Sequence, residues 1–297
     1  MNNTIAVVVT YNRIKLLLEN INCLLAQSVK DLDILVIDNN STDGTGEALK
    51  PYIDNKQILY HNTGKNLGGA GGFQLGIKLA AEAGYKYIWV MDDDCMPEAD
   101  ALAQLLIADE KLCGNYGFLA SKVLWKDGSI CAMNVQRRTL TKNVKDFSEE
   151  LISVKMSSFV SFFVKSETVC ELGLPIKEFF IWTDDWEYTR RISKKYPCYL
   201  VTGSVVVHKS NANIGANISN DSLDRLDRYR YLYRNDVYLY RREGIKGFFY
   251  ELFRLNLHAL KTLFKAKNKR FKRIKIIFGG SISGLKFNPK IEFPEKS

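Results

Sequence analysis

The sequence predicts an α/β fold with a mixed central sheet, followed by a basic helical tail. Before Gly114, short β-branched runs alternate with segments of helical spacing, as expected for a doubly wound parallel sheet. After Gly114, strand-like segments predominate, which favours antiparallel additions to that sheet. Ligands of such sheets bind beyond the carboxyl ends of the strands, so the residues at those ends are the first candidates for a site.

The expected strands of the first half are continuous apolar runs, typical of strands buried on both faces. They cover residues 5–10, 34–37, 58–61 and 87–91. Helices are expected at residues 14–26, from about Thr45, at 73–83 and at 98–110, because apolar residues recur there at helical spacing. The later strands are expected at 118–125, 130–135, 157–165 and 199–207, and the chain becomes helical again from Arg225.

Composition is that of an ordinary globular protein, with 46% hydrophobic and 25% charged residues among 297. No run reaches the roughly 18 apolar residues of a membrane span. The six cysteines form no CxxC pair, and the start of the chain does not read as an export signal, so reduced thiols in a cytoplasmic protein are expected.

The net charge of +9 is unevenly distributed. From Asp221 onward the chain carries 19 Lys and Arg against 8 Asp and Glu, a net charge of +11, whereas the first 220 residues carry −2. Apolar residues of the tail fall mainly on one helical face, and the basic run 265–275 follows. This pattern favours binding to an anionic membrane surface, with packing on the preceding domain or on a second subunit as the alternative. Nucleic-acid binding is not expected, since no basic recognition motif accompanies the charge.

Three consecutive aspartates, Asp92, Asp93 and Asp94, end the last strand of the first half. Crowded like charges at a buried strand end cost free energy, so a cation is expected to balance them. Because side chains alternate along an extended chain, Asp92 and Asp94 can face one side together. Carboxylate ligands suit Mg²⁺ or Mn²⁺, which often bind substrate phosphates as well. An acidic helix cap is the alternative interpretation.

A glycine-rich segment, TGKNLGGAGGF at residues 63–73, precedes an expected helix. Glycines at a helix start let the backbone approach a phosphate or diphosphate closely. The segment matches neither a Walker loop nor GxGxxG, and a turn that serves close helix packing is the alternative.

A second acidic pair, Asp184 and Asp185, lies among aromatic residues in FFIWTDDWEYTRRI, residues 179–192. Aromatic neighbours exclude water and raise a carboxylate pKa, which suits a general base. A helix N-terminus with acidic first-turn residues is the alternative. His208 follows the last expected strand; a lone histidine is more often structural, but beside an acidic site it can complete a metal ligand set.

Together these segments predict the transfer of a group from a nucleotide diphosphate donor. Between about residues 4 and 209, six of them resemble, in order and spacing, the inverting family 2 glycosyltransferases with the GT-A fold, a Rossmann-like nucleotide-diphospho-sugar transferase fold. They are VVVTYNR, VIDNNSTDGT, NLGGAGGF, MDDDCMPEADAL, FFIWTDDWEYTRR and VVVHK. The glycine segment and WTDDWEYTRR most resemble the galactofuranosyltransferase branch, whereas rhamnosyltransferases more often carry Glu-Asp in place of Asp184-Asp185.

The change in charge near Asp221 and the resemblance together predict a catalytic domain at 1–220, with a nucleotide-sugar half at 1–114 and an acceptor half at 115–220, before a tail at 221–297. The resemblance places Asp92 and Asp94 as metal ligands with His208 as a third, and Asp185 as the base with Asp184 beside it. The donor nucleotide is expected to contact Thr10, Tyr11, Arg13, Asp38, Asn66, Gly68, Gly69 and Asp93.

The expected function is metal-dependent inverting transfer of a sugar, galactofuranose from UDP-galactofuranose, to a lipid-linked bacterial surface glycan such as O-antigen or capsule. Transfer of rhamnose from dTDP-rhamnose, or of a hexose from another UDP-sugar, is the first alternative. A non-catalytic sugar- or nucleotide-binding partner is the second. The expected cofactor is Mn²⁺ or Mg²⁺, the expected place is the inner face of the cell membrane, and a homo-oligomer is compatible with the sequence. The galactan polymerases of this branch are much longer, so processive polymerisation is not expected.

Overall fold

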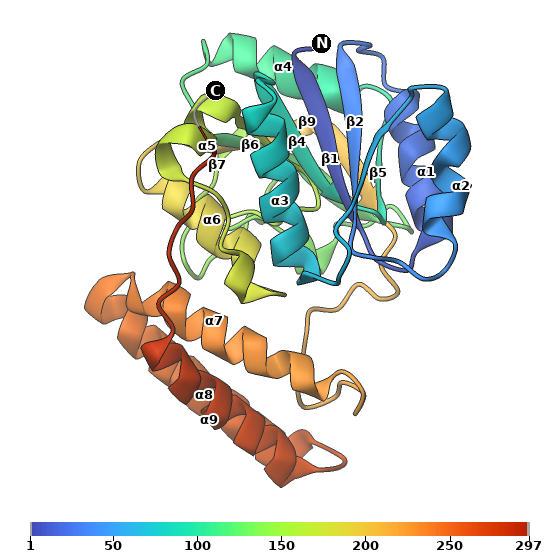
Figure 1. The fold of residues 1–297 in the computed structure, drawn as a ribbon. Helices are drawn as coiled ribbons and strands as arrows, with labels where there is room; N and C mark the ends of the chain where they lie inside the picture. Colours follow the sequence, from blue (N-terminus) through green and yellow to red (C-terminus); the bar gives the residue numbers. More distant parts are fainter. Residues whose placement is uncertain (1, 296–297) are drawn as a thin grey trace.

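The computed structural model describes residues 2–295, which form a mixed sheet covered by helices and a bundle of three further helices (Figure 1). The strands are β1 Thr4–Thr10, β2 Leu32–Asp38, β3 Leu59–Asn62, β4 Tyr87–Asp92, β5 Cys95–Pro97, β6 Phe118–Trp125, β7 Leu151–Ser153, β8 Phe162–Lys165 and β9 Tyr199–His208. The α-helices are α1 Ile14–Leu25, α2 Thr45–Asp54, α3 Gly68–Glu82, α4 Ala101–Lys111, α5 Ser166–Leu172, α6 Asp184–Ser193, α7 Tyr229–Arg241, α8 Gly244–Lys265 and α9 Arg270–Lys286. Short 3₁₀ turns are η1 Ala132–Asn134, η2 Lys177–Phe179 and η3 Leu226–Arg228.

The sheet order is β3-β2-β1-β4-β8-β6-β9-β5, and β7 pairs with β9. The strands β3, β2, β1 and β4 are parallel, and β8 is antiparallel to both β4 and β6. Since β9 is parallel to β6, it runs in the same direction as β4. The carboxyl ends of β1, β2, β4 and β9 therefore share one edge, which confirms the predicted mixed sheet and brings His208 to the edge that carries Asp92.

Two apolar cores lie on the two faces of this sheet. Ile5, Val7 and Val9 of β1 point toward α3, α5 and α6, while Ala6 and Val8 point toward α1, α2 and α4. This alternation follows from the two-residue period of a strand, and it explains why the predicted buried strands are apolar throughout.

Close packing of α3 on the sheet requires glycine. A Cβ at Gly72 would lie 2.6 Å from Val9 Cγ1, and one at Gly76 would lie 2.3 Å from Val7 Cγ1. The helix begins at Gly68, five residues before the predicted start. Gly72 and Gly76 lie on the side of the helix that faces the sheet. Packing therefore accounts for part of the glycine-rich segment.

The C-terminal helices α7, α8 and α9 pack against one another around Leu226, Tyr229, Tyr233, Leu255 and Ile277. They lie below the sheet in Figure 1, with α7 nearest to α6. After α9 the chain returns to the end of α5, where Leu174 N donates to Glu292 O at 2.8 Å. Within residues 2–295, no helix is long and apolar enough to cross a bilayer.

Two predicted strands are wrong in whole or in part. Residues 130–135 contain only an isolated bridge at Ile130 and the turn η1, since Asn134 N bonds back to Cys131 O instead of to a neighbouring strand. The strand predicted at 157–165 begins only at Phe162, because the serines before it bind side chains, as Ser161 Oγ does with Trp89 Nε1 at 2.9 Å. The strands β5 and β7 were not predicted, because three residues show no periodicity.

Candidate active site

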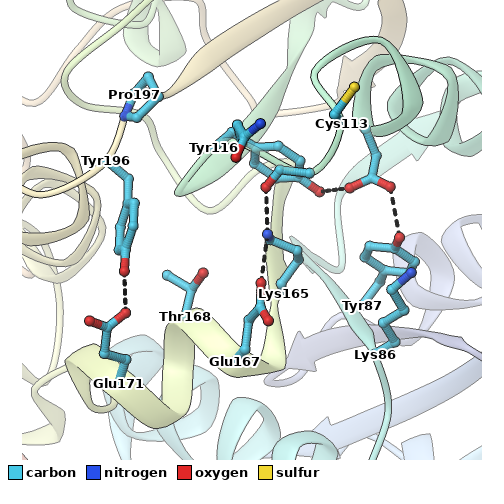
Figure 2. A pocket seen from close by; sticks show the side chains of 13 residues that line it. Lys86, Tyr87, Cys113, Tyr116, Lys165, Glu167, Thr168, Glu171, Tyr196 and Pro197 are labelled. Atoms are coloured by element: carbon cyan, nitrogen blue, oxygen red, sulfur yellow. Dashed lines mark hydrogen bonds and ion pairs between the residues drawn. The ribbon is translucent and has the colours of Figure 1, made fainter.

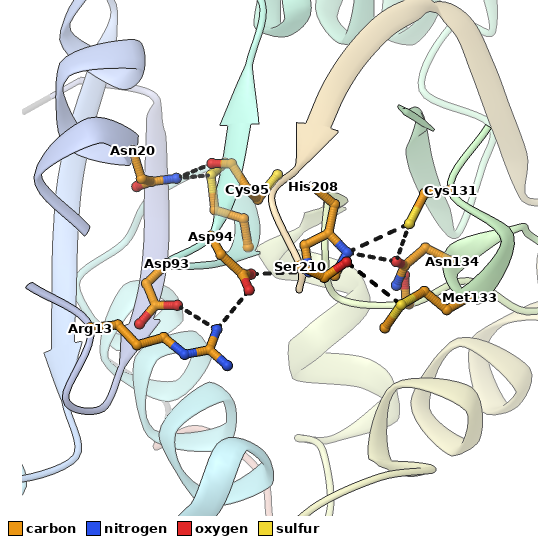
Figure 3. A network of polar contacts seen from close by, with 12 residues as sticks. Arg13, Asn20, Asp93, Asp94, Cys95, Cys131, Met133, Asn134, His208 and Ser210 are labelled. Carbon is orange, nitrogen blue, oxygen red and sulfur yellow. Dashed lines mark hydrogen bonds and ion pairs between the residues drawn. The ribbon is translucent and has the colours of Figure 1, made fainter. Parts of the chain in front are cut away.

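The three aspartates lie where β4 ends and the chain turns into β5. Figure 3 shows Asp93 and Asp94 in this turn. Asp92 is the last residue of β4, and Asp93 and Asp94 form the turn. His208, the last residue of β9, is in register with Cys95 on β5. Ligand atoms of Asp92, Asp94 and His208 all lie within 4.8 Å of one another. The structure thus brings together the three residues that the sequence assigns to a metal.

Contacts behind His208 orient its ring. Its Nδ1 lies 2.8 Å from Asn134 Oδ1, an oxygen that can only accept, so Nδ1 carries the proton. Asn134 in turn donates to Ser158 Oγ at 3.0 Å, and Cys131 Sγ lies 3.7 Å from Nδ1. The Nε2 atom is thereby directed at Asp94 Oδ1, 3.0 Å away. Such outer partners usually fix the tautomer of a metal-binding histidine. No pattern in the sequence points to Asn134 or Cys131 as partners of this histidine.

Asp93 points the other way, toward β1. Its carboxylate accepts from Thr10 Oγ1 at 2.7 Å and from Arg13 Nη1 at 3.2 Å. The same Arg13 nitrogen lies 2.6 Å from Asp94, so one guanidinium bridges two of the three acids. Side chains that the sequence assigns to the nucleotide are therefore in direct contact with the acidic turn.

The electrostatics of this cluster fit a divalent cation. Burial, reinforced by Asp94, raises the pKa of Asp92 to about 7. Burial raises the pKa of Asp93 to about 6 against the opposing charge of Arg13. Two carboxylates and one imidazole, crowded together at the end of a buried strand, are donors that Mn²⁺ or Mg²⁺ accepts.

The expected nucleotide residues on β2 and the glycine loop lie beside this cluster along the same edge. Asp38, which is buried at the end of β2, accepts from Ser41 N at 2.8 Å and from Tyr60 Oη at 2.7 Å, next to a pocket of about 370 Å³. Tyr11 is exposed. Asn66 Oδ1 accepts from Gly68 N at 2.8 Å. A Cβ at Gly68 would lie 2.1 Å from Phe180 O, so this glycine is where the donor half approaches the segment before α6.

The second acidic pair opens α6, with Thr183 as its N-cap. Asp184 is buried and Asp185 is partly exposed. Burial raises the pKa of Asp184 to about 6. Burial also raises the pKa of Asp185 well above its usual range, and the charges of Asp184 and Asp92 raise it further. Asp185 therefore lies close enough to the metal cluster for Asp92 to affect its protonation. A carboxylate with a raised pKa can accept a proton from a hydroxyl group.

A pocket of about 750 Å³ lies at the opposite end of β4, beside Tyr87 (Figure 2). Its polar groups satisfy one another: Asp109 accepts from Tyr87 Oη at 2.7 Å and from Tyr116 Oη at 2.8 Å, and Lys165 pairs with Glu167 at 2.7 Å. The candidate active site is therefore the smaller, more acidic edge at the carboxyl ends of the strands.

Comparisons with known proteins identify relatives of the chain. Residues 5–116 match the family described as Glycosyl transferase family 2. The chain is 26% identical to galactofuranosyltransferase GlfT1 of Mycolicibacterium smegmatis over 81% of this chain and 84% of that protein. It is 29% identical to GlfT1 of Mycobacterium tuberculosis over 63% of each chain.

A crystal structure of GalNAc-T7 with UDP, GalNAc and Mn²⁺ superposes with a TM-score of 0.60. The sequences are 17% identical, and the match covers 95% of this chain and 57% of that one. The likeness extends to the C-terminal helices, since it includes nearly all of this chain.

Proposed function

Because the chain is a family 2 glycosyltransferase of the GT-A fold, related to the galactofuranosyltransferases, we propose that it transfers galactofuranose from UDP-galactofuranose to a glycan hydroxyl. The observation that carries the proposal is the gathering of Asp92, Asp94 and His208 within 4.8 Å, with Asp185 in electrostatic reach of Asp92. The choice of galactofuranose is supported by the two GlfT1 relatives, which cover most of the chain.

The proposed reaction is a single displacement. Asp185 accepts the proton of the acceptor hydroxyl, and the acceptor oxygen forms a bond to the anomeric carbon as the bond from that carbon to the UDP oxygen breaks. The anomeric configuration inverts. Asp184, buried beside Asp185, holds the acceptor. A Mn²⁺ or Mg²⁺ held by Asp92, Asp94 and His208 supplies positive charge to the UDP leaving group when bound.

The proposed donor site continues along the same edge. Asp38 contacts the uracil or ribose, since it is buried at a strand end beside a pocket of about 370 Å³. We assign Arg13 to the diphosphate of the donor, since its guanidinium already lies beside Asp93 and Asp94. The remaining donor contacts are assigned to Thr10, Tyr11, Asn66, Gly68, Gly69 and Asp93.

The experiment is release of nucleotide by the purified chain with Mn²⁺, a glycan acceptor and a panel of UDP- and dTDP-sugars. We expect turnover with UDP-galactofuranose, loss of at least about 1,000-fold in kcat for Asp185→Asn, and unchanged UDP affinity in that variant. Asp54→Asn, at an exposed position on α2, is the matched control.

Any other result of this experiment favours one of the alternative functions or assignments. Turnover only with dTDP-rhamnose or another UDP-hexose keeps the chemistry and replaces the donor. Binding without turnover for every donor identifies a non-catalytic partner. Full activity of Asp185→Asn refutes the assignment of the base.

We place the acceptor on a membrane, as a lipid-linked surface glycan at the inner face. The support is α8, whose exposed apolar residues recur at i, i+3 and i+4 along one face. They are Ile245, Phe248, Phe249, Leu252, Phe253, Leu260 and Phe264. The basic run 265–275 that follows complements anionic headgroups.

A further inference from the structure

The segment that leads into α6 has an unusual backbone. Phe180, Trp182 and Thr183 have φ angles of 63°, 65° and 68°, in the left-handed region that L-residues with large or β-branched side chains rarely adopt. Such a conformation persists only where surrounding contacts impose it. Because Thr183 is the N-cap of α6, the direction of this backbone sets where Asp184 and Asp185 point.

The contacts that hold this backbone come from α7, about fifty residues later in the chain. Asn235 is fully buried, and its Nδ2 lies 3.0 Å from Phe179 O, 3.2 Å from Ile181 O and 2.9 Å from Trp182 O. Its Oδ1 accepts from Arg234 Nε at 3.0 Å, so every polar atom of the side chain is used. One amide therefore holds three carbonyls of the strained segment.

The next residue, Asp236, holds the side chain of the N-cap. Thr183 Oγ1 donates to Asp236 Oδ1 at 2.6 Å, and both groups are buried. The other oxygen of Asp236 pairs with Arg254 of α8, which also binds Glu251 at 2.7 Å. A buried chain of polar contacts thus runs from α8 through α7 to Thr183, the N-cap of α6.

Tyrosines of α7 pair with the aromatic residues of the segment. The ring centroids of Phe180 and Tyr231 are 5.0 Å apart, and so are those of Trp182 and Tyr229. On the opposite side, Phe180 O accepts from Ala70 N at 3.2 Å, which ties the segment to α3. The segment is therefore fixed between the glycine loop and α7.

We infer that Asn235 and Asp236 are positioning residues for the transfer reaction: they hold the left-handed backbone before α6 and so fix Asp184 and Asp185 relative to the Asp92–Asp94–His208 cluster. The inference rests on the proposed role of Asp185. It makes α7 a part of the catalytic site and not only a link to the membrane-facing helix.

The first test replaces Asn235 with Ala, with Val237→Ala as the matched control. Val237 is also buried on α7, but it packs against Gly284 of α9, and its apolar side chain cannot form a hydrogen bond to residues 179–183. For Asn235→Ala we expect kcat to fall about 100-fold, as small misplacements of catalytic groups do, with the affinity for UDP and Mn²⁺ unchanged. We also expect faster amide hydrogen exchange in residues 179–185, and little change in either measurement for Val237→Ala.

A double-mutant cycle separates positioning from general loss of structure. If Asn235 acts through Asp185, the kcat of Asn235→Ala/Asp185→Asn equals that of Asp185→Asn alone. Equal activity of Asn235→Ala and Val237→Ala, or unchanged exchange at 179–185, overturns the inference. If Asn235→Ala does not fold, Thr183→Val and Thr183→Ser test the inference instead. Only serine keeps the hydroxyl that donates to Asp236, so only Thr183→Ser is expected to retain activity.

The two proposals fail separately. Loss of transfer by every donor in the wild-type chain would refute the proposed function. Hydrogen exchange at residues 179–185 in Asn235→Ala would still report whether α7 holds the segment.

Discussion

At the scale of single residues, Asp184 is a carboxylate whose burial opposes its own ionisation. Its pKa of about 6 in the folded chain lies above the usual 3.8, so the folded state binds the proton more tightly than the unfolded state. Stability is therefore lost as the pH rises from about 4 to about 6, and the loss is complete above pH 6.

We predict that Asp184→Asn raises the free energy of unfolding by about 2 to 3 kcal/mol at pH 8 and by only about 1 kcal/mol at pH 4.5. Urea denaturation of the metal-free chain at both pH values measures this. Asp54→Asn, at an exposed site, is expected to change neither value. A lower free energy of unfolding for Asp184→Asn at pH 8 would show that attractive contacts of the carboxylate outweigh the cost of burying its charge.

A second prediction concerns the ring orientation of His208. His208→Ala removes a proposed ligand, whereas Asn134→Ala removes only the acceptor that binds Nδ1 at 2.8 Å. We expect Mn²⁺ affinity to fall about 10- to 100-fold for Asn134→Ala and further for His208→Ala. Calorimetric titration with Mn²⁺ in the absence of sugar measures both. Equal affinity of Asn134→Ala and wild type would separate Asn134 from the metal site.

A site residue can be predicted only where the local sequence pattern marks it. Asp92 and Asp94 are marked by charge at the end of an apolar strand, and His208 by its place after another strand, so local sequence was enough to group them. Asn134 and Asn235 contact the site through side-chain bonds to distant segments. A single asparagine without a pattern does not indicate such a contact, so neither was predicted.

At the scale of elements, α3 shows how packing overrides local preference. Glycine is a poor helix former, so the sequence predicted a start at Phe73, yet the helix begins at Gly68 because Gly72 and Gly76 allow it to lie against β1. Likewise, α6 was recognised only as an alternative interpretation of an acidic, aromatic segment. Its start depends on contacts from α7 that no local pattern displays.

We predict opposite effects of adding one methyl group to two helix glycines. Gly76→Ala would place a Cβ 2.3 Å from Val7 Cγ1 and is expected to destabilise the chain by about 1 to 3 kcal/mol. Gly279→Ala in α9 meets nothing within 4 Å and is expected to stabilise by up to about 1 kcal/mol. Thermal unfolding of the two variants is the comparison, and a stabilising Gly76→Ala would contradict the packing described.

At the scale of the whole molecule, α8 presents an apolar face to solvent beside a basic segment. We predict that the chain sediments with vesicles containing about one third anionic lipid, and that binding weakens as salt increases. Phe249→Ser/Phe253→Ser, at positions 59% and 69% exposed, is expected to reduce binding at least about tenfold.

The control for vesicle binding is Leu59→Ser, which removes an exposed apolar side chain from β3, in the catalytic region. It should bind vesicles as wild type does. Equal binding by the double phenylalanine variant would show that α8 does not face the bilayer.

The charge distribution predicts a boundary near Asp221, and α7 begins at Tyr229. Charge does not reveal, however, that the first helix of the bundle binds the segment before α6. The division into catalytic domain and tail stays a prediction about sequence organisation.

The dependence of the 179–183 backbone on α7 also orders events during synthesis. A ribosome makes Asp185 fifty residues before Asn235, so the sheet and the Asp92–Asp94–His208 cluster can form while the backbone before α6 still lacks the contacts of α7. Under the roles proposed for these residues, we expect a nascent chain in this state to bind nucleotide but not to transfer sugar. Transfer is expected only after the bundle has emerged and docked, at which point α8 with its exposed apolar face is also complete.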